Sequence, residues 1–170
     1  MYSLIPNLIY ESVSDLTPEV LGSHGIRVLL MDFDNTIVPY TSNEPKAEVL
    51  AWLDRVKSAG IQLCVVSNTK KGRAIQFCQQ HGIDCITHAN KPFQKGIGKA
   101  KEKFAELGKI ALVGDQIYTD ILGANGGNIV SVLIRPIHLH NFFLKFRHVL
   151  ELPWIAWGRR RLKNEPSGKV

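Results

Sequence analysis

Residues 26–36 read Ile-Arg-Val-Leu-Leu-Met-Asp-Phe-Asp-Asn-Thr, an apolar run that ends in an acidic loop. Large aliphatic residues in a run this short are typical of a buried strand in a parallel sheet. Four further short apolar runs follow along the chain, and helix-like patterns separate them. Strands that alternate with helices in this way are joined by right-handed crossovers. The sequence therefore predicts an α/β fold, a three-layer αβα sandwich around a five-stranded parallel sheet.

The expected elements can be placed by residue number. The five strands are expected at residues 26–32, 61–66, 83–87, 109–113 and 129–134. Helices are expected at residues 46–59, 70–81, 93–107 and 119–124. Thr17 followed by Pro18 has the pattern of a helix start, so we expect a short helix before the first strand.

The composition is that of an ordinary globular protein and excludes several other classes. The 170 residues are 45% hydrophobic and 21% charged, which argues against disorder. No run of about 18 apolar residues is present and the first residues lack a basic region, so we expect neither a spanning helix nor a secretory signal. The three cysteines form no Cys-x-x-Cys pair, which argues against a disulfide framework or a zinc site. We therefore expect one domain, residues 1–170, in the cytoplasm.

Polar side chains come directly after four of the predicted strands. In chain order they are Asp32, Asp34, Ser67, Asn68, Lys91, Asp115 and Asp120. Ligands of open α/β sheets bind outside the carboxyl ends of the strands, where these side chains should converge. Taken singly, the aspartates and Ser67 are more often turn or cap residues and Lys91 a solvated surface residue, but all of them follow apolar runs in one order. Carboxylates suit Mg²⁺, and a lysine with a hydroxyl suits phosphate, so the set predicts a site for both.

The motifs resemble those of the haloacid dehalogenase (HAD) superfamily of phosphohydrolases. Four segments carry the resemblance: Asp32-Phe-Asp-Asn-Thr36, Ser67-Asn-Thr69, Lys91-Pro92 and Gly114-Asp-Gln-Ile-Tyr-Thr-Asp120. They are most similar to the YqeG-type, class IIIA branch, which includes relatives resembling the mitochondrial phosphatidylglycerophosphate phosphatases. The resemblance covers about residues 4–155. It implies a Rossmann-like sheet in which the predicted strands lie in the order 5-4-1-2-3.

The resemblance also implies the chemistry of the site. Asp32 would be the nucleophile that forms an aspartyl-phosphate, and Asp34 the general acid and then the general base. Ser67 and Lys91 would bind the substrate phosphate. Asn68 lies close enough to touch the substrate, although hydrogen bonding within its loop is an equal alternative.

The same resemblance implies a magnesium site built from carboxylates. The Mg²⁺ ion would be held by the side chains of Asp32 and Asp115 and by the backbone carbonyl of Asp34. Asp120 would orient a metal-bound water.

The spacing of the motifs leaves no room for a cap domain. Ser67 follows Thr36 by 31 residues and Lys91 follows Ser67 by 24, and each interval holds one predicted helix and one predicted strand. An uncapped site favours a substrate too large to enclose, such as a protein, a nucleic-acid end or a lipid headgroup. We expect a Mg²⁺-dependent phosphomonoester hydrolase that acts on phosphatidylglycerophosphate in phosphatidylglycerol synthesis. A HAD phosphatase for a protein, nucleic-acid or soluble phosphoester, or a non-catalytic binding protein on the same fold, is the alternative.

The excess positive charge lies at the C-terminal end. Residues 135–170 hold eight Lys or Arg against two Glu, and the rest of the chain is neutral. Aromatic residues at helical spacing, two tryptophans and Arg159 to Arg161 make the segment at about residues 138–161 typical of a helix on an anionic membrane. The alternatives are a last helix packed on the sheet and, less favoured, a contact with RNA. The first interpretation adds peripheral attachment to the inner face of the cell membrane. Residues beyond 161 are expected to fray.

Overall fold

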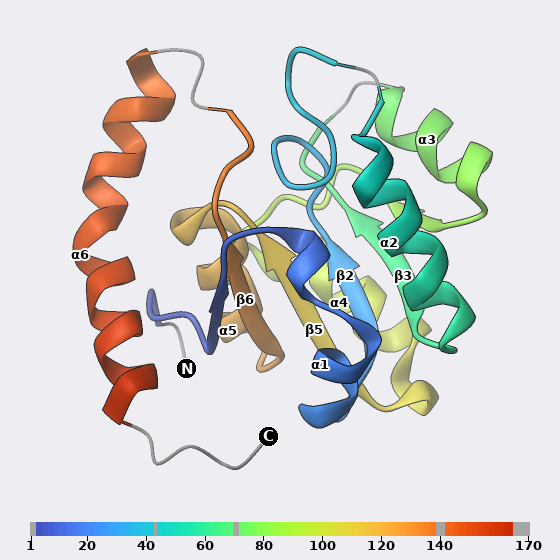
Figure 1. Ribbon diagram of the computed structural model, residues 1–170, viewed down its shortest axis with the longest axis horizontal. Helices are drawn as coiled ribbons and strands as arrows, with labels where there is room; N and C mark the ends of the chain where they lie inside the picture. The colour runs from blue at the N-terminus through green and yellow to red at the C-terminus, as the bar shows by residue number, and fades with distance from the viewer. Residues whose placement is uncertain (1–2, 43, 70–71, 139–141, 165–170) are drawn as a thin grey trace.

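The computed structural model describes residues 3–42, 44–69, 72–138 and 142–164. Their central feature is a six-stranded parallel sheet (Figure 1). The strands lie in the order β1-β6-β5-β2-β3-β4. Their bounds are β1 Leu8–Tyr10, β2 Ile26–Met31, β3 Gln62–Val66, β4 Asp84–Ile86, β5 Lys109–Gly114 and β6 Val130–Ile134. The predicted α/β class and the order of the five predicted strands are confirmed.

In the described parts of the chain, five helices lie between these strands along the sequence, and a sixth follows the last strand. They are α1 Pro18–Ser23, α2 Ala47–Ser58, α3 Arg73–His81, α4 Gln94–Lys103, α5 Leu122–Gly126 and α6 Phe142–Asn164. Single turns are η1 Val13–Asp15, η2 Ala105–Leu107 and the π-helical η3 Ile117–Ile121. The predicted start of α1 is confirmed, because Thr17 Oγ1 accepts a hydrogen bond from the backbone N–H of Val20 at 3.3 Å.

Alternate residues of the central strand point to opposite faces of the sheet and pack against different helices. Leu29 and Met31 belong to a core that includes buried residues of α1, α2 and α3. Val28 and Leu30 belong to a second core formed with α4 and α5. Both faces of β2 are therefore dry, which is why its sequence is a continuous apolar run rather than an alternating one.

The predicted number of strands is wrong, because the sheet has six strands rather than five. Leu8–Tyr10 forms a sixth, short strand that pairs in parallel with β6 at the edge of the sheet. A run of three residues just after a Pro-Asn pair is too short to stand out as a strand by periodicity. It is held instead by contacts from distant residues. The side chain of Asn7 accepts a hydrogen bond from the Ser131 backbone N–H at 2.9 Å, and that of Asn125 donates to the carbonyls of Ser3 and Ile5.

The C-terminal helix α6 lies along the β1–β6 edge (Figure 1). Trp154 and Ile155 pack on the buried Ile117, Ile121 and Leu133, and Gly158 lies directly against Pro6 and Ile9. The helix runs to Asn164, past the predicted limit of order at residue 161. Leu139 falls outside the described residues, and so do residues 165–170. Among the described residues, no helix is both long and apolar enough to cross a membrane.

We expect Ser131→Ala to lower the free energy of unfolding by about 1–3 kcal/mol, because it leaves buried hydrogen-bond partners unpaired. Ser131 is fully buried and its Oγ lies 3.0 Å from Asn7 Oδ1 and 2.8 Å from Asn125 Oδ1. Urea unfolding measures the change. Ser14→Ala is the matched control, because Ser14 Oγ is buried with no hydrogen-bond partner among the described residues. Equal losses in the two variants would contradict the account of how β1 is held.

Candidate functional site

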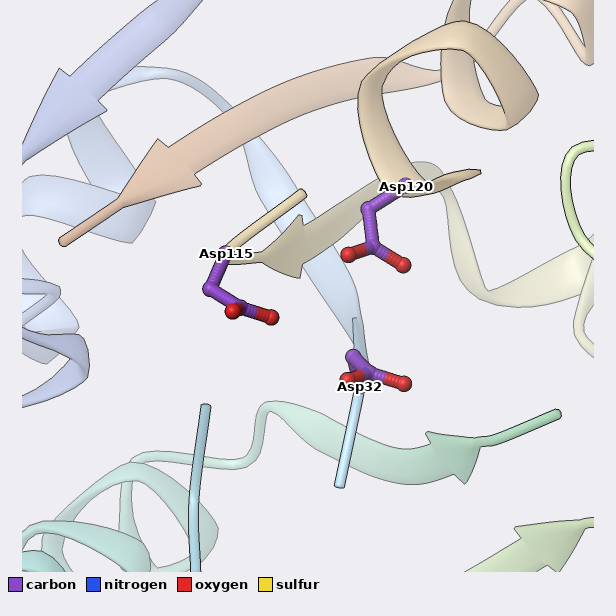
Figure 2. A group of neighbouring side chains, drawn as sticks. All are labelled: Asp32, Asp115 and Asp120. Carbon is purple, nitrogen blue, oxygen red and sulfur yellow. The ribbon is translucent and has the colours of Figure 1, made fainter. Parts of the chain in front are cut away.

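Three buried carboxylates converge at the carboxyl edge of the sheet (Figure 2). Asp32 follows β2 directly, Asp115 follows β5, and Asp120 comes from η3. One oxygen of each carboxylate lies within 4.8 Å of an oxygen of each of the others. The neighbouring strands β2 and β5 bring Asp32 and Asp115 together, as expected where parallel strands end side by side.

Asp120 reaches the site because Gly114 leaves space for it. A Cβ at position 114 would lie 2.3 Å from the carboxyl carbon of Asp120. The π-helical turn η3 then places the Asp120 backbone so that the carboxylate accepts a hydrogen bond from the Gln116 N–H at 3.2 Å. The glycine of the Gly-Asp motif is thus a packing requirement of the site.

A single ammonium group lies among these carboxylates in the part of the chain that the structure describes. Lys91 Nζ is 2.7 Å from Asp32 Oδ1 and 2.7 Å from Asp120 Oδ1, and the lysine side chain is 1% exposed. Burial alone would lower the pKa of Lys91, but the carboxylates of Asp120 and Asp32 outweigh it and raise the pKa. Lys91 therefore stays charged in this site.

The carboxylate of Asp32 is strongly affected by its surroundings. Its pKa is raised to about 7: burial is the largest cause, the Lys91 ammonium opposes it, and the neighbouring carboxylate of Asp120 adds to it. One ammonium cannot balance three carboxylates. The site without a further cation therefore favours a proton on Asp32 at mildly acidic pH.

The loop after β2 holds Asp115 in place. Asn35 Nδ2 lies 3.4 Å from one Asp115 oxygen and Thr36 Oγ1 lies 3.3 Å from the other. Asn35 has φ 67°, a left-handed conformation that asparagine tolerates better than most residues. Its side-chain oxygen also accepts a hydrogen bond from the His138 backbone N–H at 2.8 Å. These residues shape the loop and orient a carboxylate.

Asp34 lies on the more accessible side of the site and is paired with an arginine that sequence analysis missed. Arg73 Nη1 is 3.1 Å from Asp34 Oδ1, and the two side chains are 20% and 18% exposed. The same guanidinium donates to the carbonyls of Pro39 and Ser42 and lies over the Phe33 ring. A basic residue at the first position of the helix after the Ser-Asn-Thr motif was the signal available for finding it.

Ser67 and Asn68 occupy the predicted edge but differ in their contacts. Ser67 is buried, and its Oγ accepts a hydrogen bond from the Thr69 N–H at 3.1 Å. Asn68 donates to the Lys91 carbonyl at 2.9 Å and accepts from the Lys91 N–H at 2.7 Å. In this structure Asn68 therefore fixes the backbone that carries the buried ammonium, which is the loop alternative considered from sequence.

The donor set fits a hard divalent cation. Buried carboxylates of Asp32, Asp115 and Asp120 are close enough to share one ion, and they carry more negative charge than Lys91 neutralises. Oxygen ligands without sulfur or imidazole suit Mg²⁺ better than Zn²⁺. The described residues place Asp120 in the same cluster as Asp32 and Asp115.

Comparisons with known proteins match a family model and a curated relative, and both are described as phosphatases. The family described as mitochondrial PGP phosphatase matches residues 2–137, which include all seven predicted site residues. The probable phosphatase YqeG of Bacillus subtilis (strain 168) is 29% identical over 142 residues, 82% of this chain and 82% of that protein.

Two solved structures resemble the fold at low sequence identity. A hypothetical protein from Xanthomonas campestris has a TM-score of 0.50 at 16% identity and covers 92% of this chain and 99% of that one. A protein described as a HAD superfamily (subfamily III A) hydrolase from Legionella pneumophila has a TM-score of 0.47 at 18% identity, over 60% of this chain and 59% of that one. At 16% identity, the likeness to the Xanthomonas protein concerns the fold alone.

We expect Asp32→Asn to stabilise the metal-free protein at high pH. The Asp32 pKa is about 7 in the folded protein, against about 3.9 in an unfolded chain. The folded protein therefore holds a proton that the unfolded chain has lost, and its free energy of unfolding falls as the pH rises from about 4 to about 7. The variant does not lose stability in this way. Its free energy of unfolding relative to that of wild type should therefore rise by more than about 1 kcal/mol from pH 5 to pH 8.

Urea unfolding in EDTA at the two pH values measures this difference. Asp54→Asn, which removes an exposed carboxylate on α2, is the control and should show no such growth. If the free energy of unfolding of wild type rose relative to that of Asp32→Asn between pH 5 and pH 8, the cluster would not lack positive charge.

Proposed function

The chain belongs to the mitochondrial PGP phosphatase family of HAD-type phosphatases, and on this premise we propose that it hydrolyses the terminal phosphate of phosphatidylglycerophosphate through Asp32. The observation that carries the proposal is the Asp32–Lys91–Asp120 cluster beside Asp115, at the sheet edge where α/β enzymes bind ligands. We propose further that residues 1–170 form a single phosphatase domain. The phospholipid substrate and the role of each residue are parts of this proposal.

The reaction divides into two displacements. An Asp32 carboxylate oxygen attacks phosphorus, the bond between phosphorus and the ester oxygen breaks, and Asp34 gives its proton to the leaving alkoxide. Water then attacks the phosphorus of the aspartyl-phosphate, Asp34 takes the proton from that water, and inorganic phosphate leaves with Asp32 restored. Lys91 orients the Asp32 carboxylate through Oδ1 and neutralises charge on the transferring group.

Arg73 gives Asp34 a fixed position for this work. Its guanidinium is itself held by the Pro39 and Ser42 carbonyls, so its contact with Asp34 Oδ1 holds that carboxyl group in place. Ser67 supplies a hydroxyl beside the cluster for a phosphate oxygen, with Asn68 holding the Lys91 backbone.

The proposed cofactor is Mg²⁺. The side chains of Asp32 and Asp115 and the backbone carbonyl of Asp34 would hold it, and Asp120, which lies in the same buried cluster, would orient a water beside it. When bound, the ion neutralises the phosphate oxygens and removes their repulsion from Asp32. The remaining work of positioning falls to the residues described above.

The proposed substrate is a lipid headgroup because the described residues include no element that would enclose a small molecule. Among the described residues, α2 and β3 fill the interval between the first two motifs, and α3 and β4 fill the next. Water exclusion and substrate selection must therefore come from elsewhere on the surface.

Helix α6 offers such a surface. Its inner side packs on the domain, whereas Phe146, Val149, Leu150 and Trp157 are about half exposed. Arg159, Arg160 and Arg161 are exposed and follow Trp157 closely. Exposed apolar residues beside a cationic cluster are complementary to the interface of an anionic membrane, and we propose that α6 lies there.

The catalytic proposal predicts that purified protein releases phosphate from phosphatidylglycerophosphate only with Mg²⁺. EDTA should abolish the activity and added Mg²⁺ should restore it. Asp32→Asn should lower kcat by about 10³-fold or more, because the nucleophile is lost. Phosphate release measures all three effects.

Asp54→Asn serves as the control for carboxylate loss and should keep wild-type kcat. Release from soluble phosphoesters but not from the lipid would overturn the substrate assignment. Equal metal-dependent rates in wild type and Asp32→Asn would overturn the catalytic assignment, and full activity in EDTA or restoration by Zn²⁺ alone would overturn the cofactor.

The membrane proposal predicts that the protein co-sediments with vesicles containing phosphatidylglycerol and that salt weakens this binding. Changing Arg159, Arg160 and Arg161 together to glutamate should weaken it by at least about tenfold, since each basic residue near the surface contributes about 1 kcal/mol. The control changes the exposed Arg27, Arg55 and Lys99 to glutamate, which alters net charge equally and away from α6. Equal losses in both triple variants, binding indifferent to lipid charge, or preferential retention on RNA would contradict the proposal.

A further inference from the structure

A cavity of about 300 Å³ lies between α6 and the ends of β1 and β6, and it reaches the carboxylate cluster. Asp115 forms part of its wall, so the cavity meets the proposed catalytic site from the side of the C-terminal helix. Leu133, Leu152 and Ile155 line it with apolar surface. This volume is at the lower end of the range for small-molecule sites, which begins at about 300 Å³. That size suits a polar headgroup fragment rather than acyl chains.

Two guanidinium groups also line this cavity. Arg135 follows β6 and Arg159 comes from α6, and their side chains are 77% and 59% exposed. Glu11 lies between them, 3.5 Å from Arg135 Nη1 and 3.3 Å from Arg159 Nη2. One carboxylate shared by two guanidinium groups leaves a net positive charge at this wall. Exposed ion pairs of this kind are weak, so an incoming anion can compete with Glu11 for both arginines.

We propose that this cavity is a second phosphate subsite, in which Arg135 and Arg159 bind the phosphodiester of the substrate headgroup while its terminal phosphate lies at Asp32. The inference rests on the proposed function and deepens it. A phosphatidylglycerophosphate headgroup carries two phosphates joined by glycerol, and the cavity joins a cationic wall to a carboxylate of the catalytic cluster. The apolar walls suit the glycerol carbons, and α6 lies where the acyl chains would continue into a membrane.

The subsite provides a way to select a substrate without a cap. A phosphomonoester with no second phosphate would occupy only the catalytic edge and gain nothing from the arginines. Arginine can bind a phosphate through two parallel N–H groups, which gives direction as well as charge. The enzyme would then prefer two-phosphate headgroups through a lower KM rather than through a different chemical step.

The test uses soluble substrates in the absence of any membrane, so that binding of α6 to lipid plays no part. The two-phosphate probe is deacylated phosphatidylglycerophosphate, and the one-phosphate probe is glycerol 3-phosphate. Arg135→Gln and Arg159→Gln should each raise KM for the two-phosphate probe by about three- to tenfold and leave the one-phosphate reaction unchanged. Glu11→Gln should lower KM for the two-phosphate probe by about twofold or more, because it frees both guanidinium groups. Lys163→Gln, an exposed cation one turn beyond Arg159 on α6, is the matched control and should change neither reaction.

The outcomes separate the subsite from the proposed function. If wild type hydrolyses the two-phosphate probe and neither arginine variant alters its KM, the subsite is wrong and the catalytic proposal stands. If Lys163→Gln raises KM as much as Arg159→Gln, general charge explains the effect and the subsite is wrong. The subsite is likewise wrong if the arginine variants impair both probes equally. If wild type hydrolyses neither this probe nor the intact lipid, the substrate proposal fails and the subsite fails with it.

Discussion

The buried ammonium of Lys91 is the interaction on which the site depends. It lies 2.7 Å from carboxylate oxygens of both Asp32 and Asp120. Buried carboxylates are costly unless they are paired, and removing one partner of such a group leaves an uncompensated charge. Because Lys91 follows β4, Asp32 follows β2 and Asp120 follows β5, the pairing draws on three separate parts of the sheet. The candidate site is therefore complete only when the strand order β5-β2-β3-β4 is complete.

A third carboxylate, that of Asp115, lies in the same cluster, so the carboxylates outnumber the single ammonium group of Lys91. Asn35 and Thr36 hold the two oxygens of Asp115, but neither carries a charge. The polypeptide thus orients three acids while neutralising only part of their charge. A fold can tolerate this excess negative charge where a cation, or an anionic ligand together with its counterion, balances it. Uncompensated charge of this kind is typical of functional sites. The raised pKa of Asp32 expresses the same imbalance.

Most of the sheet and of the carboxylate cluster could be predicted from the sequence because both depend on local patterns. The central strands are continuous apolar runs, and Asp32, Ser67 and Asp115 each come directly after one of them. The edge strand Leu8–Tyr10 could not be predicted in this way, since Asn7, Asn125 and Ser131 hold it through contacts more than 100 residues apart in the chain. Arg73 was missed for a similar reason. Its partners are Asp34 and the Pro39 and Ser42 carbonyls, which lie far back in the sequence and give no periodic signal.

The two interpretations of the segment that forms α6 do not exclude each other. From sequence, its apolar residues suited either a helix packed on the sheet or a helix at a membrane, and the described residues include both a packed side and an exposed side. The family match ends at residue 137, before this helix begins.

The packed side of α6 is fastened to the turn that carries a member of the carboxylate cluster. The buried Glu151 accepts a hydrogen bond from the Ile117 N–H at 3.0 Å, and Tyr118 Oη donates to the Leu150 carbonyl at 3.2 Å. Ile117 and Tyr118 belong to η3, the same five-residue turn that contains Asp120. A surface that fixes the outer side of α6 would therefore also fix η3 and, through Asp120, the position of Lys91. Helix α6 and the geometry of the cluster are thus joined through η3, by the Glu151–Ile117 and Tyr118–Leu150 hydrogen bonds on one side and the Asp120–Lys91 ion pair on the other.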